Sequence, residues 1–517
     1  MRVHHYLARA RQLYGPREAV VDGARRFTYS EFAGRCHQLA RALAALGVGP
    51  GDRVGIVSPN THYFLEAFFG VACLGAVIVP LNYRLIGDDF QYSLDHAGAR
   101  VVLADDDLRA TVDEIRDRLP SVEHYVVAGP PASGWLDWEE LLSGHSTDPL
   151  PDPDRQEDDL VSINYTSGTT ARPKGVMLTH ANFVTNAYNF ISHFGISHHD
   201  TALWTLPMFH CNGWGGVYAL TGMGARQVII RAPEGEAIFR AVAEENVTFA
   251  CMAPIVLGRI LDFERAAEFS LKTRPRIVVA GAPPPVAYVR RLEQELGWTF
   301  HQIYGLTETS PIITVAELRP HLEGDPYVLK ARAGQPALGA EIRVVDSHGP
   351  VACDDQSVGE VTVRGRMVFA GYWRQPEATA AVMKDGFFHT GDLATVDASG
   401  SINIVDRAKD VIISGGENIS SIEVEDTLYH HPGVLEAAVI GVPDDKWGET
   451  PLAVIVPRPG VTLKAEDLRA YCREHMAHFK VPHLFEFRQA LPRTATGKLK
   501  KFELREPYWG NSQRRVH

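Results

Sequence analysis

At 517 residues the chain is longer than one hydrophobic core usually organises, so two or more domains are expected. Hydrophobic residues make up 45% and charged residues 22%, and no apolar run approaches the ~20 residues of a membrane helix. A net charge of −12 argues against a nucleic-acid partner, because phosphate contacts need a basic face. The first residues lack the apolar segment of a signal peptide, so we expect a cytoplasmic protein without an integral membrane segment.

Charge is unevenly spread along the chain. From Arg407 to the end, 16 Lys and Arg oppose 15 Asp and Glu, whereas the first 406 residues hold 35 against 48. The near-neutral end indicates a separate C-terminal unit. The 6 cysteines are scattered without a CxxC pair or a His/Cys cluster at metal spacing, which argues against a disulfide frame or structural zinc.

Apolar runs of strand length alternate with helical patterns through the first four hundred residues. Helices are expected over residues 29–46 and 89–96, because apolar residues recur there at spacings of three and four. Strands are expected at residues 53–57, 76–80, 100–104, 126–128, 227–230, 277–280 and 299–303. This alternation predicts an α/β fold with mostly parallel sheets and ligand-holding loops at the strand ends.

The pattern changes after residue 340. Segments 341–349 and 359–368 alternate with Gly and Asp turns, which predicts a small antiparallel β subdomain. The charged string at 406–410 lies between two apolar runs, as hairpin turns often do. The last stretch, about 110 residues, mixes strand and helix patterns and is long enough for a small α+β domain.

A loop at residues 165–175 reads YTSGTTARPKG. Its hydroxyls, its free backbone N–H groups and one ammonium are what a polyphosphate needs, although such strings also occur as flexible surface turns. It is not the common P-loop, which would require a Gly-Lys-Ser/Thr ending. The candidate phosphate-binding residues are Thr166, Ser167, Gly168, Thr169, Thr170 and Lys174.

A second string, Tyr304-Gly305-Leu306-Thr307-Glu308-Thr309, follows the strand expected at 299–303. A tyrosine can stack on a purine, a glycine lets a ligand approach the backbone, and Thr and Glu offer oxygens to a phosphate and its Mg²⁺. Alone this string is weak evidence. Together with the first loop it predicts a site that binds MgATP from two sides.

Two further strings carry candidate polar groups. Asp392 follows Gly391 on a tight turn and is placed to accept from ribose hydroxyls, although an Asx turn explains it equally well. Lys498 follows Thr496-Gly497 near the end of the chain. Charge runs there are usually solvated, yet this placement could carry one ammonium into a site on another domain.

With these strings in this order, the chain resembles the adenylate-forming superfamily of acyl-CoA synthetases, firefly luciferase and peptide-synthetase adenylation domains. The resemblance covers nearly the whole chain, from residues 26–29 to the tail around Lys498. Ala171 stands where the phosphate loop usually has its third glycine, and Asp406 precedes Arg407 where many relatives have glycine. Neither departure removes a chemical group.

The resemblance implies how ATP would be held. The phosphate loop would bind the β- and γ-phosphates, with Thr166 and Glu308 near Mg²⁺. The groups around adenine and ribose would be Tyr304, Gly305, Thr307, the turn Gly281-Ala282-Pro283, Asp392 and Arg407.

The resemblance also implies two half-reactions separated by a domain rotation. Lys498 would bridge the substrate carboxylate and the AMP phosphate, where a cation offsets anion–anion repulsion. The C-terminal domain, residues 407–517, would then rotate against the N-terminal domain, residues 1–406, about a hinge near Lys409. Afterwards Gly415, Gly416 and Glu417 would face the site and leave room for the pantetheine arm of CoA.

Residues 207–216, PMFHCNGWGG, resemble the acyl-binding stretch of fatty-acyl and aryl-acyl CoA ligases. His210 would close the carboxylate end of the pocket, and Trp214 would gate a fatty-acyl tunnel, with glycines at 213, 215, 216 and 222 leaving space beside it. Gly215, Gly305 and Thr309 would line the pocket. A satisfied core histidine and a buried core indole are the plain alternatives. Cys211 is expected to be packing.

The predicted function is that of an ATP-dependent acid–CoA ligase, most simply for a medium- to long-chain fatty acid, with ATP, Mg²⁺ and CoA. An aryl or branched acid is the nearest variant. An acyl-AMP ligase that loads a carrier protein is another class, although no inserted block is seen between residues 341 and 406. A luciferase-like oxygenase would share all these motifs. An amino acid is disfavoured because Phe209-His210 replaces the Asp that would hold its ammonium. A homodimer is left open.

Overall fold

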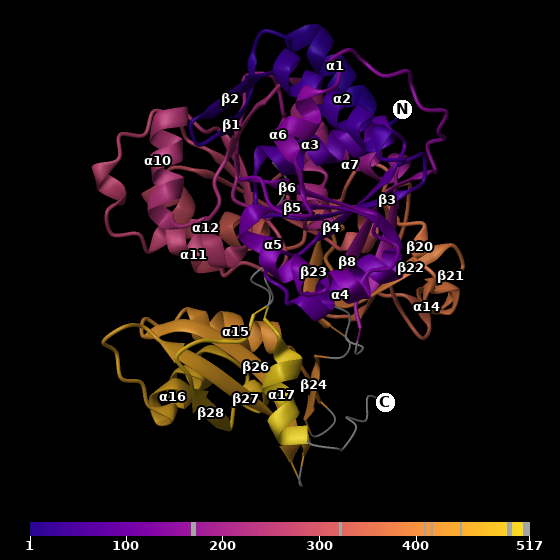
Figure 1. Cartoon of the computed structure of the whole chain (residues 1–517). Helices are drawn as coiled ribbons and strands as arrows, with labels where there is room; N and C mark the ends of the chain where they lie inside the picture. The colour runs from indigo at the N-terminus through magenta and orange to yellow at the C-terminus, as the bar shows by residue number, and fades with distance from the viewer. Residues whose placement is uncertain are drawn as a thin grey trace.

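The computed structural model describes residues 1–166, 172–319, 323–407, 410–414, 417–444, 447–493 and 499–509. A larger body carries the N-terminal part of the chain, and a smaller body below it in Figure 1 carries the C-terminal part. None of the helices in the described ranges combines the length and the apolar character that a membrane crossing requires.

One long mixed sheet forms half of the larger body. Its strand order is β16-β15-β14-β13-β12-β10-β11-β1-β2, and the run from β14 to β1 is parallel. Its strands are β1 (Glu18–Asp22), β2 (Arg25–Thr28), β10 (Thr201–Trp204), β11 (Arg226–Ile229), β12 (Phe249–Met252), β13 (Arg276–Val279), β14 (Thr299–Gly305), β15 (Ile312–Val315) and β16 (Gln335–Pro336).

A second mixed sheet forms the other half, in the order β20-β9-β8-β4-β3-β5-β6-β7. It is parallel from β8 to β7, whereas β8 and β9 form an antiparallel pair. Its strands are β3 (Arg53–Val57), β4 (Val77–Leu81), β5 (Ala99–Asp105), β6 (His124–Ala128), β7 (Leu136–Asp137), β8 (Leu160–Thr166), β9 (Lys174–Thr179) and β20 (Gly371–Tyr372).

Helices separate and cover these two sheets. Alternate residues of one strand face different layers: Val101 and Leu103 of β5 point into the central core, and Val102 points outward. The central layer holds α1 (His4–Tyr14), α2 (Tyr29–Ala45), α3 (His62–Cys73), α7 (His180–Phe194) and α9 (Gly216–Met223). The outer layers hold α4 (Gly87–Ala97) and α5 (Asp106–Asp113) on one side, and α10 (Gly235–Glu245), α11 (Pro254–Leu261) and α12 (Val286–Glu295) on the other.

The sequence sets the ends of these helices through capping. At the start of α2, Thr28 Oγ1 accepts from the backbone N–H of Glu31, and Glu31 accepts from the backbone N–H of Thr28. Helix α4 ends at Gly98 in the left-handed region, φ 67°. Shorter helices are α6 (Trp138–Ser143), α8 (Cys211–Trp214), α13 (Pro326–Ala331), α14 (Pro376–Val382), η1 (Arg116–Arg118), η2 (Ala266–Glu268), η3 (Thr307–Thr309) and η4 (His478–Lys480).

An antiparallel sheet completes the larger body, in the order β18-β17-β19-β22-β21 with β23 beside β22. Its strands are β17 (Glu341–Asp346), β18 (Gly349–Pro350), β19 (Gly359–Arg364), β21 (Met383–Lys384), β22 (Phe387–Val396) and β23 (Ile402–Arg407). This is the small β subdomain that the sequence predicts after residue 340.

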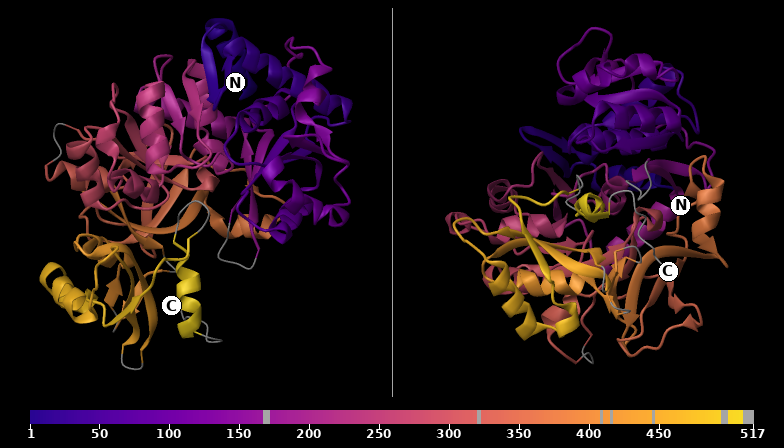
Figure 2. Two further views of the ribbon diagram at one scale, coloured as in Figure 1. Left: turned by 60° about the vertical axis from the view of Figure 1, so that its left-hand side comes forward. Right: turned by 90° about the horizontal axis from the view of Figure 1, so that it is seen from below.

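The smaller body has its own sheet, β25-β24-β27-β26 with β28 beside β27, and its own apolar core. Figure 2 shows the smaller body beside the larger one. The two are connected by the rings of Tyr288 and Tyr429, whose centroids lie 6.4 Å apart, and by a 3.5 Å ion pair of Asp262 with Arg458. Its elements are β24 (Ile412–Ser414), β25 (Glu417–Ile419), α15 (Ser421–Tyr429), β26 (Val434–Asp444), β27 (Gly448–Pro457), α16 (Ala465–His475), β28 (Leu484–Phe487) and α17 (Lys501–Trp509). The predicted α/β fold class is confirmed.

Candidate active site

The base of the phosphate loop is an antiparallel hairpin. Thr166 at the end of β8 pairs with Lys174 at the start of β9, so the loop leaves and returns at one point. Helix α4 supports this base, because Tyr92 Oη donates to the carbonyl of Pro173 (3.2 Å) and His96 Nδ1 lies 2.9 Å from Tyr165 Oη. The predicted phosphate ligands Ser167, Gly168, Thr169 and Thr170 lie outside the described residues.

Tyr372 of β20 connects this hairpin to the second string. Its ring lies beneath Lys174, with Nζ 4.7 Å from the ring centroid, and its hydroxyl donates to Glu308 Oε1 at 2.9 Å. The backbone N–H of Phe369 also donates to the carbonyl of Glu308, at 2.8 Å. The structure therefore brings two motifs together that are more than a hundred residues apart in sequence.

The carboxylate of Glu308 fits a divalent cation. Burial raises its pKa above the ordinary value, and within the described part of the chain it has no Lys or Arg within ion-pair distance. One of its oxygens accepts from Tyr372 Oη at 2.9 Å. A buried carboxylate without a cationic partner is costly, and a hard cation such as Mg²⁺ binds oxygen ligands of this kind.

Three residues predicted for the ribose side, Tyr304, Asp392 and Arg407, bond to one another; Asp392 is buried and the other two are half-buried. Tyr304 Oη donates to Asp392 Oδ2 at 2.7 Å, and Arg407 Nε lies 3.1 Å from Asp392 Oδ1. Burial, and then the charge of Asp392, raises the pKa of Tyr304, so its phenol stays a donor. Asp392 bonds across to another sheet rather than to its own turn, so the Asx-turn alternative is wrong. We call Tyr304, Glu308, Asp392 and Arg407 the nucleotide wall.

Two predicted glycines serve different purposes. A Cβ at Gly305 would lie 1.6 Å from the carbonyl oxygen of Pro311, so any side chain is excluded there. Beside it, Thr309 Oγ1 donates within this bend, 2.6 Å from the same carbonyl, and is fully buried. Gly281 instead has a φ of 92° with nothing within 4 Å of a built Cβ. Glycine is favoured at position 281 because the backbone there is left-handed. Gly281, Ala282 and Pro283 form an exposed turn.

Residues 211–215, which we call the acyl turn, adopt a left-handed backbone. The φ angles are 47° at Cys211, 51° at Asn212, 58° at Gly213, 56° at Trp214 and 67° at Gly215. A left-handed conformation costs ~1–2 kcal/mol at each non-glycine residue, and such strain gathers at functional sites.

Asparagine side chains hold the acyl turn in place. Asn212 Oδ1 accepts from Ser162 Oγ at 3.0 Å and Asn164 Nδ2 at 3.2 Å. Asn186 Nδ2 donates to the carbonyl of Trp214 at 2.7 Å, and Asn186 Oδ1 accepts from the backbone N–H of Ile312 at 3.3 Å. Asn186 thus ties the acyl turn to the strand that follows Thr309.

The neighbourhood of the acyl turn corrects one expectation. A Cβ at Gly213 would meet the ring of Trp204 at 2.4 Å, one at Gly215 would meet Asn186 at 2.5 Å, and one at Gly222 would meet the ring of Tyr6 at 2.2 Å. The space beside these glycines is filled rather than open. Trp214 is 3% exposed and packs in the central core, and His210 is half-buried beside Phe209, their rings 6.5 Å apart.

Charged contacts surround the segment predicted as a hinge. Arg505 of α17 forms an ion pair with Asp410, and Lys501 pairs with Glu425 at 2.8 Å. Asp406 accepts from Ser421 Oγ at 2.6 Å. The predicted hinge residue Lys409, the catalytic candidate Lys498, and Gly415 and Gly416 lie outside the described residues, while Glu417 is exposed at the start of β25.

The fold and the nucleotide wall define a class of protein: an ATP-dependent, AMP-forming acid–thiol ligase. The AMP-binding enzyme family matches residues 7–373, and the AMP-binding enzyme C-terminal domain matches residues 423–498. The chain therefore belongs to the adenylate-forming superfamily, in its acyl-CoA synthetase family.

The names of its relatives give different acids as substrates. The chain is 38% identical to 4-hydroxybutyrate–CoA ligase 2 of Metallosphaera sedula, over 97% of this chain and 93% of that one. It is 39% identical to the long-chain-fatty-acid–CoA ligase of Thermus thermophilus, over 97% and 95%. The crystal structure of the anthranilate CoA ligase AuaEII with anthranoyl-AMP matches with a TM-score of 0.91 and 27% identity, over 98% and 97%.

Sequence reasoning missed three residues of this site: Tyr372, Asn186 and Asn212. The string Gly371-Tyr372-Trp373 offered a signal for the first, because adjacent aromatic residues are frequent in strands, and Tyr372 lies in β20. The asparagines gave none, because the partners of Asn186 lie 28 and 126 residues away.

Proposed function

We propose that this chain joins a fatty acid to CoA through an acyl-adenylate, with release of AMP and pyrophosphate. The observation that carries the proposal is the nucleotide wall. In it the bonded residues Tyr304, Asp392 and Arg407 adjoin Glu308, and Tyr372 connects Glu308 to Lys174. The triad offers hydrogen-bond partners to a ribose, and the lysine offers an ammonium to phosphates. This arrangement supports binding of ATP beside a carboxylate.

In this proposal the chain's own residues orient the two reacting anions. Asp392 would accept from the ribose hydroxyls while Arg407 and Tyr304 hold its carboxylate in place. Thr166 and Glu308 would hold Mg²⁺, which supplies charge neutralisation at the phosphates when bound. Lys498 would offset the charge between the carboxylate and the α-phosphate, and Gly415, Gly416 and Glu417 would face the site for CoA after rotation about Lys409. Residues 1–406 and 407–517 would be the two moving parts.

The acid is proposed to be a fatty acid, with aryl or branched acids as the alternative. His210 would close its carboxylate end, and Trp214, Gly215 and Thr309 would bound its chain. The filled space around Gly213, Gly215 and Gly222 favours the shorter end of the medium- to long-chain range. Among the relatives, both the 4-hydroxybutyrate ligase and the long-chain ligase are close in identity, so the acid is open to direct test.

The test is a panel of straight-chain acids from C2 to C18 together with benzoate and anthranilate, assayed with ATP, Mg²⁺ and CoA. We expect AMP, pyrophosphate and a thioester, with kcat/KM highest for a straight-chain acid. Pyrophosphate exchange without thioester formation would instead favour transfer to a carrier protein. A maximum at an aryl acid would overturn the fatty-acid proposal and leave the ligase class intact.

A further inference from the structure

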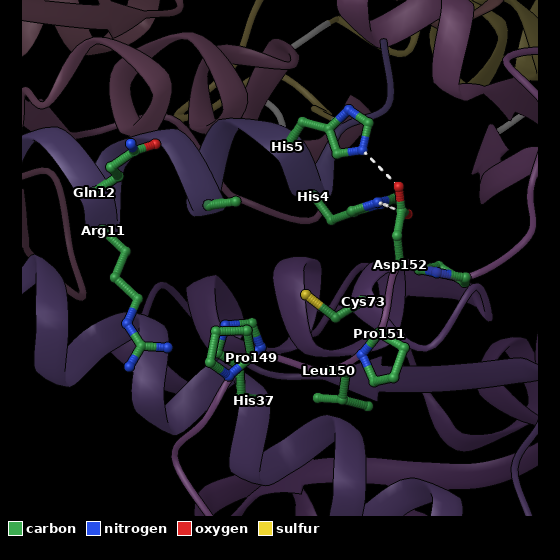
Figure 3. Close-up of a pocket in the computed structure, with 12 residues that line it drawn as sticks. His4, His5, Arg11, Gln12, His37, Cys73, Pro149, Leu150, Pro151 and Asp152 are labelled. Atoms are coloured by element: carbon green, nitrogen blue, oxygen red, sulfur yellow. Dashed lines mark hydrogen bonds and ion pairs between the residues drawn. The ribbon is translucent and has the colours of Figure 1, made fainter.

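A second cluster of chemically active side chains lies outside the candidate active site, on helix α1. His4 Nε2 lies 2.8 Å from Asp152 Oδ1, and His5 Nε2 lies 3.2 Å from Asp152 Oδ2 (Figure 3). The ligand atoms of these three residues all lie within 4.8 Å of one another. Two imidazoles and one carboxylate form the donor set that Zn²⁺ and its first-row neighbours prefer over Mg²⁺ or Ca²⁺.

The cluster opens on a cavity of about 460 Å³ between α1, α2 and residues 149–153. His37 lines this cavity, is 6% exposed, and has no hydrogen-bond partner in the described ranges for Nδ1. His4 Nδ1 is buried and unpartnered in the same way. Buried polar atoms of this kind are normally satisfied, and the cavity has room for waters or a small anion that would satisfy them.

The guanidinium of Arg2 lies at this cluster, where a metal ion would bind. Its Nη2 forms an ion pair with Asp152 and lies 3.4 Å from His5 Nε2, while its Nη1 donates to the carbonyls of Pro153 and Arg155 at 2.9 and 2.8 Å. The guanidinium and a metal ion would compete for the same carboxylate.

We propose that His4, His5 and Asp152 form a binding site for a divalent transition-metal ion of the zinc type, which displaces the Nη2 end of Arg2 from Asp152. Its effect is structural. It fastens α1 to the proline-rich segment 149–153, which leads directly into β8 and the base of the phosphate loop. The proposal does not depend on the proposed ligase function, because its readouts need no substrate.

The chain carries its own control for this proposal. His198 and His199 are another adjacent histidine pair, with ring centroids 4.0 Å apart. The carboxylate of the neighbouring Asp200 accepts hydrogen bonds from Arg276 and Thr248 instead. No carboxylate within the described residues groups with that pair at ligand distance. A surface that merely collects metal on histidines would use both pairs equally.

The experiment titrates ZnCl₂ into the tag-free, chelator-treated full chain by calorimetry, with CoCl₂ as an optical probe of the ligand field. We expect one saturable site. Zinc should also raise Tm, because it binds the folded chain.

Variants distinguish the site from non-specific binding. His5→Asn and Asp152→Asn should each weaken zinc binding by about tenfold or more, and Arg2→Gln should tighten it. His198→Asn with His199→Asn should leave it unchanged, and Tm in chelator identifies any variant that fails to fold. Absence of one saturable site, equal loss in both histidine pairs, or no tightening in Arg2→Gln would overturn the proposal.

Discussion

The nucleotide wall and the acyl turn lie side by side but are held in different ways. In the wall, the side chains of Tyr304 and Arg407 both bond to Asp392 on a frame of paired strands. In the acyl turn, five consecutive left-handed residues are held by the side chains of Asn186 and Asn212. The proposed nucleotide side thus rests on charged and polar side chains, whereas the part proposed to meet the acid rests on backbone shape.

The largest effect is expected at Lys498, which the resemblance places between the two anions. Lys498→Ala should lower adenylation, measured as ATP–pyrophosphate exchange, by roughly 10²–10³-fold, because a charge at the reacting centre is lost. Thioester formation from supplied acyl-adenylate should change little. Lys500→Ala, which removes only an ion pair to Glu503, is the control. Equal loss in both half-reactions would contradict the two-step assignment.

Asp392 tests whether the wall acts as one unit. Asp392→Asn removes the charge that Arg407 and Tyr304 both bond to, so it weakens both interactions. We expect kcat/KM for ATP to fall by about 10–10²-fold, and kcat/KM for the acid to fall less. The measurement is initial rates with either substrate varied. Asp385→Asn, on an exposed turn where φ is 51°, should be silent. A larger change in KM for the acid than for ATP would show that the wall and the acyl side are not separate.

Glu308 should separate stability from activity. Burial raises its folded pKa above the unfolded value, so the stability it contributes is present at low pH and is lost as pH rises through the folded pKa. Glu308→Gln should therefore raise Tm at neutral pH and flatten its pH dependence, yet lower the rate and the response to Mg²⁺. Glu317→Gln, at a half-exposed carboxylate beside His193, is the control. A fall in Tm at neutral pH would show that Glu308 is stabilised by a partner instead.

Asn212 tests the strained side. Both Asn212→Gly and Asn212→Ala lose the hydrogen bonds to Ser162 and Asn164. Glycine still accepts a φ near 51°, whereas alanine does so only with strain. Chemical denaturation should show Ala less stable than Gly by about 1–2 kcal/mol. Both variants should raise KM for the acid and leave KM for ATP nearly unchanged. Equal stability would mean that the hydrogen bonds, and not the backbone, hold the turn.

The sequence predicted the wall better than the turn, for physical reasons. Tyr304, Glu308 and Asp392 stand in short strings where glycine and hydroxyl residues mark ligand-facing bends, and strands such as 53–57 follow a clear apolar period. The filling of the space at Gly213 and Gly222 by Trp204 and Tyr6 depends on packing between distant elements, which no local pattern contains. From the sequence alone these glycines predicted open space for a ligand. In the structure they are needed because the rings of Trp204 and Tyr6 lie too close for a side chain.

Among these variants, Cys211→Ala is expected to change activity least. Burial raises the pKa of the Cys211 thiol well above the ordinary value, and Sγ lies 4.0 Å from the carbonyl of Thr307, so this residue of the acyl turn packs against η3 as a neutral group. Cys211→Ala should leave both half-reactions close to wild type and lower stability by about 1 kcal/mol. The half-buried Cys251, changed to Ala, is the control for thiol-reagent sensitivity. Loss of thioester formation alone in Cys211→Ala would make the thiol a participant, because packing at this position acts on both half-reactions alike.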